Sequence, residues 1–75
     1  MMSREVRRAF NVLGLAPDVS DEELKQTFRR LMSEYHPDKL VARGVSAAEL
    51  ERAKSKAQEI QSAYAIIRKH RRASK

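Results

Sequence analysis

Three polar side chains that could do chemistry lie within a few residues of one another, namely Ser33, His36 and Asp38. A hydroxyl, an imidazole and a carboxylate are the groups that serve as nucleophile, base and orienting group in covalent catalysis. His36 and Asp38 are also possible ligand types for a metal ion. However, no glycine-rich nest for an oxyanion accompanies them, and the second histidine, His70, lies far along the chain. We therefore expect no catalytic site, no metal and no cofactor.

Pro37 gives the tripeptide His36-Pro37-Asp38 a conformational role. Proline fixes its own backbone, donates no N–H group, and moves the preceding residue out of the helical region. The preceding helix is therefore expected to end at Tyr35. Asp38 is expected to close an Asx-type turn through its own side chain. Taken alone, this is the pattern of an ordinary loop after a helix.

The residues before the tripeptide predict two helices. Apolar residues recur at helical spacing from Val6 to Leu13, and Gly14 is placed for a left-handed C-terminal cap. Ser20 and Glu23 form a capping box that begins the second helix. The second helix carries one apolar stripe, which we expect to be core: Leu24, Phe28, Leu31 and Tyr35.

The residues after the tripeptide predict a loop and a third helix. Residues 39–45, which include Gly44, are expected to form the loop, and Ser46 with Glu49 makes a second capping box. Apolar residues then alternate by three and four, as in a helix packed along a neighbour: Leu50, Ala53, Ala57, Ile60, Tyr64 and Ile67. We expect an all-α fold in which the second and third helices form an antiparallel hairpin and the first helix packs on it. The tripeptide then lies at the exposed tip.

Length and composition agree with one small helical domain. The chain has 75 residues, only two Gly and two Pro interrupt it, and it has no Cys, which fits a reducing compartment. No apolar run approaches the roughly 20 residues that span a bilayer. We expect a single monomeric domain over residues 1–75, with a core over about residues 6–67 and a basic C-terminal tail over 68–75.

The net charge of +6 is concentrated in that tail. Residues 68–75 carry five Lys or Arg and no acid, which leaves +1 for the rest of the chain. Such a run is most often a solvated helix end, which the helix dipole also favours. Contact with RNA, DNA or anionic lipid is the alternative. On the second helix, Lys25, Arg29 and Arg30 are expected to face solvent.

A small basic domain of three helices could also be a helix-turn-helix DNA binder. That motif places a turn of about 3 to 4 residues before the helix that enters the major groove. The expected loop from His36 to Val45 is longer. DNA or RNA binding is therefore kept only as the alternative function.

Several motifs, in this order and spacing, resemble a J domain of the DnaJ (Hsp40) family. They are Phe10-x-x-Leu13-Gly14-Leu15, the helix from Leu24 to Tyr35, His36-Pro37-Asp38, and Lys56-Ala57-Gln58-Glu59-Ile60-x-x-Ala63-Tyr64. The resemblance covers about residues 6–67. The segments on both sides of the tripeptide, 31–34 and 39–44, are most similar to the C-terminal J domain of membrane-anchored bacterial DjlA-type co-chaperones.

The resemblance implies a co-chaperone that docks on an Hsp70 (DnaK-type) chaperone, stimulates its ATP hydrolysis and binds no small-molecule substrate. It makes His36, Pro37 and Asp38 the functional centre. By the same carry-over, the docking charges are Lys25, Arg29, Arg30 and Lys39. It also implies a cytoplasmic domain of a protein anchored in the bacterial inner membrane.

Three features depart from the family pattern. Phe28 stands where many J domains have Tyr, and Ala57 stands where Phe is common in the third helix. The usual Gln-Lys-Arg-x-x-Tyr-Asp segment is replaced by the basic tail. None of these departures changes the tripeptide.

Overall fold

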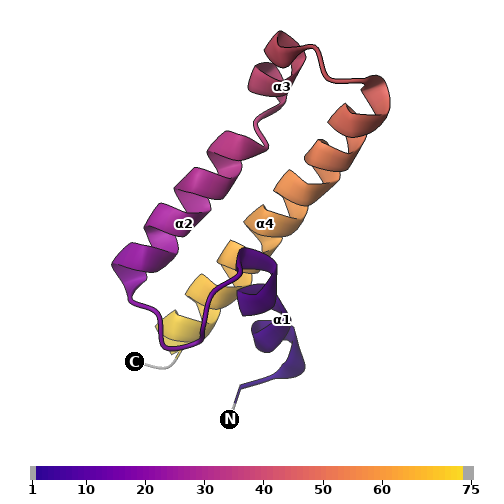
Figure 1. Ribbon diagram of the computed structural model, residues 1–75. Helices are drawn as coiled ribbons and strands as arrows, with labels where there is room; N and C mark the ends of the chain where they lie inside the picture. The colour runs from indigo at the N-terminus through magenta and orange to yellow at the C-terminus, as the bar shows by residue number, and fades with distance from the viewer. Residues whose placement is uncertain (1, 74–75) are drawn as a thin grey trace.

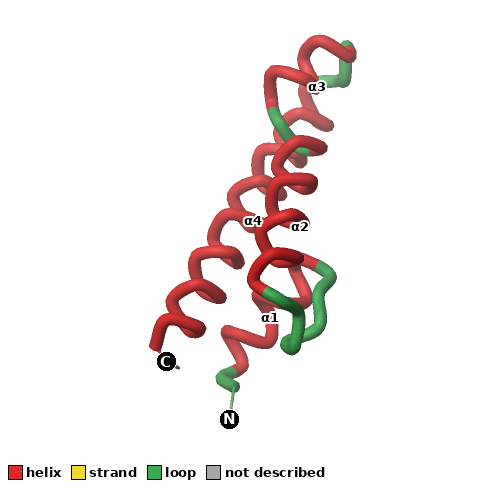
Figure 2. The backbone as a smooth tube through the Cα atoms, turned by 90° about the vertical axis from the view of Figure 1, so that its left-hand side faces the viewer, coloured by secondary structure: helices red, strands yellow, loops and turns green. Residues whose placement is uncertain are grey.

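The computed structural model describes residues 2–73, which form four helices and no strand (Figure 1). The helices are α1 (Arg4–Leu13), α2 (Asp21–Glu34), α3 (Pro37–Arg43) and α4 (Ala47–Ala73). Helices α2 and α4 lie antiparallel, and α1 packs against the C-terminal half of α4 at the open end of this hairpin (Figures 1 and 2). The predicted all-α hairpin with a short N-terminal helix is confirmed.

Local caps set the predicted helix boundaries. The Ser20 hydroxyl accepts a hydrogen bond from the N–H of Glu23 (3.0 Å), and Ser46 accepts one from Glu49 (3.2 Å). Gly14 ends α1 in the left-handed conformation with φ 69°. These contacts satisfy backbone groups that a helix end leaves without partners. Both serine caps and the glycine cap are where the sequence predicts them.

The core lies where α1, α2 and α4 meet. Its buried members are Val6, Ala9, Phe10, Leu13, Leu24, Ile60, Ala63 and Ile67. The rest of the predicted α2 stripe is half-buried and packs against this cluster: Phe28, Leu31 and Tyr35. The predicted stripe is therefore the inner face of α2, but only Leu24 is fully enclosed in it.

An aromatic pair joins α2 to α4. The rings of Phe28 and Tyr64 stack with their centroids 4.0 Å apart and an interplanar angle of 11°. The guanidinium carbon of Arg68 lies 5.6 Å from the centroid of the Tyr64 ring. Stacked rings and cation–π contacts each contribute about 0.5–1.5 kcal/mol. Phe28 therefore serves the packing of the hairpin.

The predicted loop over residues 39–45 is wrong, because Pro37–Arg43 form the short helix α3. Pro37 lies in its first turn, where a missing N–H leaves no bond unmade, and Gly44 ends it with φ 78°. Leu40 is buried, and α3 contacts α4. Seven residues are too few for a stable isolated helix, so packing against α4 stabilises α3. Loop length consequently does not argue against a helix-turn-helix.

The basic tail is part of α4 as far as Ala73, and Lys75 lies outside the described residues. Arg68, Lys69 and Arg72 are exposed, as a solvated helix end requires. Arg71 differs, because only 23% of its side chain is exposed. The expectation of a solvated tail is therefore wrong at Arg71.

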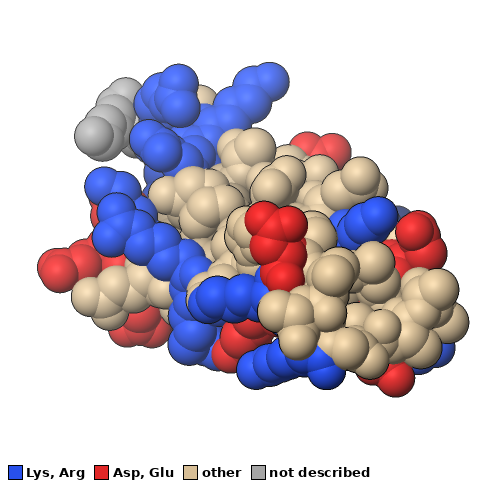
Figure 3. Space-filling view, turned by 90° about the horizontal axis from the view of Figure 1, so that it is seen from above, with Lys and Arg blue, Asp and Glu red and all other residues tan. Residues whose placement is uncertain are grey.

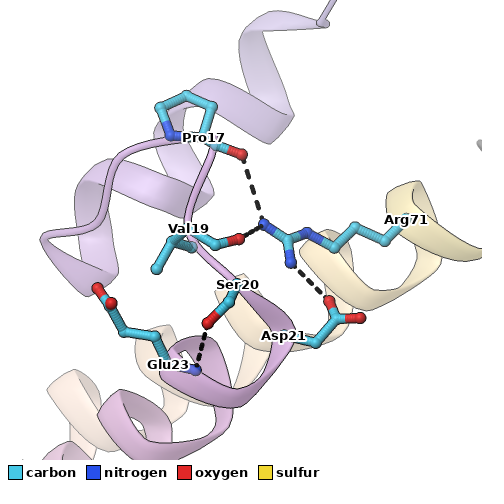
Figure 4. A network of polar contacts seen from close by, with 6 residues as sticks. All are labelled: Pro17, Val19, Ser20, Asp21, Glu23 and Arg71. Atoms are coloured by element: carbon cyan, nitrogen blue, oxygen red, sulfur yellow. Dashed lines mark hydrogen bonds and ion pairs between the residues drawn. The ribbon is translucent and has the colours of Figure 1, made fainter.

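Arg71 ties the end of α4 to the segment that leads into α2 (Figure 4). Its guanidinium donates hydrogen bonds to the backbone carbonyls of Val19 (2.6 Å) and Pro17 (3.4 Å). It also pairs with the carboxylate of Asp21 at 2.5 Å. The same guanidinium carbon lies 5.7 Å from the centroid of the Phe10 ring. A residue of the predicted tail thus belongs to the framework of the domain.

Candidate docking site at the tip of the hairpin

The tripeptide lies at the tip of the hairpin, where α2 passes into α3 (Figure 1). Tyr35 caps α2, and its N–H donates to the carbonyl of Leu31 (3.1 Å). The predicted end of α2 at Tyr35 is therefore confirmed to within one residue. His36 is extended, with φ −68° and ψ 124°, because Pro37 excludes the helical conformation there. His36 and Asp38 are exposed, whereas Pro37 is half-buried.

The imidazole of His36, and not the carboxylate of Asp38, closes the turn. His36 Nδ1 accepts a hydrogen bond from the N–H of Asp38 (3.2 Å), so His36 is the N-cap of α3. The predicted Asx turn at Asp38 is wrong, since Asp38 lies in the first turn of α3. An accepting Nδ1 means that the neutral ring carries its proton on Nε2. The turn therefore presents a donor, the His36 Nε2–H, and an exposed carboxylate.

A second contact crosses the turn from α3 back to α2. Lys39 Nζ donates to the Ser33 hydroxyl oxygen at 2.6 Å, and both residues are exposed. The hydrogen bonds described in residues 2–73 join Ser33 to Lys39 and His36 to Asp38, so they do not link Ser33 to His36. This is not the arrangement of an activated nucleophile. Among residues 2–73, no three His, Asp or Glu side chains lie close enough together to hold a metal ion.

The predicted cations of α2 are all exposed but differ in their pairing. Arg30 lies 3.3 Å from the carboxylate of Glu34, one turn further along the helix. Lys25 and Arg29 form no ion pair within residues 2–73. Glu34 was absent from the predicted site, although its i,i+4 spacing from Arg30 is a sequence signal for such a pair.

The cations are unevenly distributed over the surface. Seen from above the view of Figure 1, Lys and Arg side chains gather at the left and upper left, with some Asp and Glu at the left edge, whereas much of the right is uncharged (Figure 3). An asymmetric positive surface attracts and orients an acidic partner. The site thus combines a charged helix face with a constrained polar turn, which suits binding.

Comparison with known proteins identifies the class that this fold and turn define. The family model named DnaJ domain matches residues 8–75, and the chain belongs to this family. The predicted J-domain resemblance is therefore confirmed. No solved structure matched significantly.

The similar curated proteins carry the name co-chaperone protein DjlA. The chain is 45% identical over 67 residues to the DjlA protein of Aliivibrio fischeri. This alignment covers 89% of this chain and 24% of the relative. The chain is 51% identical over 63 residues to the DjlA protein of Escherichia coli K12, and 46% identical over 63 residues to that of Vibrio cholerae. These two alignments each cover 84% of this chain, and 23% and 22% of the relatives. The predicted likeness to DjlA-type J domains is confirmed, and the chain spans about a quarter of these relatives' length.

Proposed function

We propose that this domain is a co-chaperone module that docks on an Hsp70 (DnaK-type) chaperone and stimulates its ATP hydrolysis without catalysing a reaction itself. The observation that carries the proposal is the His36-Pro37-Asp38 turn at the hairpin tip, in which His36 and Asp38 are exposed, beside the cationic face of α2. Membership of the DnaJ domain family supports it, as does the word co-chaperone in the names of the relatives.

In the proposed docking, the cations of α2 act first, by attracting the partner. Lys25, Arg29 and Arg30 lie on a rigid helix, so their charges keep a constant position relative to the turn. Such a surface raises the association rate with an acidic partner and sets its orientation. Because these groups are exposed, salt screens them over a Debye length of about 8–10 Å. Affinity for the chaperone is therefore expected to fall as ionic strength rises.

The turn then supplies the contacts that select a conformation of the partner. His36 offers its Nε2–H, Asp38 offers a carboxylate, and Pro37 restricts the backbone between them. A turn that is already ordered loses little conformational entropy on binding. A ligand shifts an equilibrium only by its difference in affinity for the two states, and about 1.4 kcal/mol shifts it tenfold. The domain would thus stimulate hydrolysis by binding the hydrolysis-competent state more tightly.

Lys39 takes part in this proposal as the docking charge nearest the turn. Its ammonium group already contacts Ser33, which fixes its position at the start of α3. One helix face and one turn make a small interface, below about 1,200 Å² in total, which is typical of transient complexes. We propose that the domain engages its partner as a monomer.

The proposal places the domain in the cytoplasm, as one part of a longer protein. The support is the small share of each DjlA relative that the chain covers. None of the helices described over residues 2–73 is long and apolar enough to cross a membrane. An inner-membrane anchor elsewhere in the parent protein stays a prediction from the resemblance.

Single-turnover ATP hydrolysis by a purified bacterial Hsp70 tests the proposal. The wild-type domain is expected to accelerate hydrolysis, and His36→Gln is expected to abolish the acceleration while keeping the helical circular-dichroism signal. Equal acceleration by both forms, or none by either, would contradict the assigned role of the turn.

A further inference from the structure

A hollow of about 190 Å³ lies between α2 and the C-terminal end of α4, away from the tip. It is lined by Asp21, Leu24, Lys25, Tyr64, Arg68, Arg71 and Arg72. Four of these seven side chains are cationic. Two of the cations, Arg68 and Arg72, belong to the basic tail. The proposed function assigns no role to this tail.

Within residues 2–73, three of the four cations have no carboxylate within ion-pair distance. Arg71 pairs with Asp21, the one acid among the described residues that line the hollow. Lys25, Arg68 and Arg72 are exposed and form no ion pair with any residue from 2 to 73. Like charges around one depression repel one another, so an anion placed there lowers the free energy of the surface.

Contacts within the domain hold two of these cationic side chains, Arg68 and Arg71, in place. Arg68 lies over the ring of Tyr64, which is itself stacked on Phe28. Arg71 is fixed by two backbone carbonyls and supports the end of α4 on which Arg72 lies. A cation that is already positioned loses less side-chain entropy on meeting an anion than a freely moving one.

The hollow is continuous with the proposed docking face, because Lys25 belongs to both. Lys25 precedes His36 by eleven residues, or about 16 Å along the helix axis. A transient interface of about 600 Å² per partner is roughly 25 Å across. We infer that Arg68 and Arg72, together with Lys25, form a second contact for an acidic protein surface on the same chaperone that engages the turn. This inference rests on the proposed function.

A protein surface fits the hollow better than a nucleic acid. Single-stranded nucleic acids stack their bases on open aromatic faces. Here Phe28 and Tyr64 cover one another, and Arg68 covers the Tyr64 ring. Asp21, in the first turn of α2, lines the hollow and is exposed, so its carboxylate would repel a continuous phosphate chain. A single Asp or Glu side chain of a partner avoids this repulsion.

The test compares two double charge reversals. Arg68→Glu with Arg72→Glu changes the hollow. Arg4→Glu with Arg8→Glu, two exposed positions of α1 at the same spacing, makes the same change in net charge elsewhere. At low salt we expect the first pair to raise the concentration for half-maximal ATPase stimulation about tenfold, chiefly through slower association, and the control to change it less than about twofold. Maximal stimulation should stay unchanged.

Each outcome decides between the two proposals. If the wild type stimulates and His36→Gln does not, but the two double variants behave alike, the inference is wrong and the proposed function stands. If the wild type does not stimulate, both are wrong. Loss of binding to a labelled single-stranded DNA in the hollow variant, with stimulation unchanged, would overturn the inference in favour of nucleic acid. Arg68→Gln with Arg72→Gln repeats the test without added acid, should the first pair lower the melting temperature.

Discussion

The guanidinium of Arg71 and the carboxylate of Asp21 lie 2.5 Å apart although 50 residues separate them in the chain. Asp21 is the first residue of α2, and Arg71 is near the end of α4. The pair therefore joins the two ends that form the open side of the hairpin. Its importance does not come from the ion pair alone, because 81% of the Asp21 side chain is exposed and such pairs contribute little.

Replacing Arg71 by Ala is expected to lower the free energy of unfolding by about 1–3 kcal/mol. The change removes the donor to the Val19 carbonyl and the packing of the guanidinium over Phe10. Urea denaturation followed by circular dichroism measures the loss. Arg72→Ala, a neighbouring exposed position, is the control and should stay within about 0.5 kcal/mol of the wild type. Similar losses in both variants would show that Arg71 has no special structural role.

Removing the side chain of Ile60 should lower the stability of the domain more than removing that of Arg71. Ile60 has no exposed surface, and Ile→Ala at such sites lowers stability by about 2–5 kcal/mol. A domain of this length is expected to have roughly 4–11 kcal/mol in total, so the melting temperature should fall steeply. Val41→Ala is the matched control, since 61% of Val41 is exposed. A melting temperature for Ile60→Ala equal to that of the control would mean that the core is placed wrongly.

Two substitutions of His36 separate its capping role from its proposed contact with the partner. His36→Asn keeps a side-chain acceptor at the N-cap of α3, whereas His36→Ala removes it. Loss of a cap typically costs about 1 kcal/mol. We expect faster amide hydrogen exchange in α3 for the Ala variant only, and loss of ATPase stimulation for both. Full stimulation by His36→Asn would mean that histidine acts through the shape of the turn.

Neutralising two cations of α2 should slow association with the chaperone. Lys25 and Arg29 are exposed and form no ion pair within residues 2–73, so Lys25→Ala with Arg29→Ala removes steering charge while leaving the packed face of α2 unchanged. Stopped-flow binding at two salt concentrations is expected to show an association rate several-fold lower and less dependent on salt. A change confined to the dissociation rate would instead indicate close contacts with the partner.

Much of the framework could be predicted because its causes are local. Ser20, Ser46 and Gly14 act within a few residues of themselves, so their caps follow from sequence order alone. The apolar spacing along α2 and α4 likewise identifies the faces that pack. These signals sufficed for the hairpin and for the tip at which the tripeptide lies.

Helix α3 could not be predicted from such local signals. Residues 37–43 are too few to carry a clear periodic pattern, and the helix depends on the burial of Leu40 and on contact with α4. The capping role of His36 was missed for a related reason, since it follows only once Pro37 is known to start a helix.

By itself the sequence determined helices α1, α2 and α4, the caps at Gly14, Ser20 and Ser46, the position of the tripeptide at the tip and the sign of the charge, because each depends on residues near one another in the chain. Only the tertiary structure decided that Arg71 is structural while Arg68 and Arg72 line a hollow with Lys25. Asp21, Val19 and Pro17, the partners of Arg71, lie 50, 52 and 54 residues before it in the chain, and Lys25 belongs to another helix than Arg68 and Arg72. Such contacts depend on how α4 packs against α2, and no local pattern records that packing.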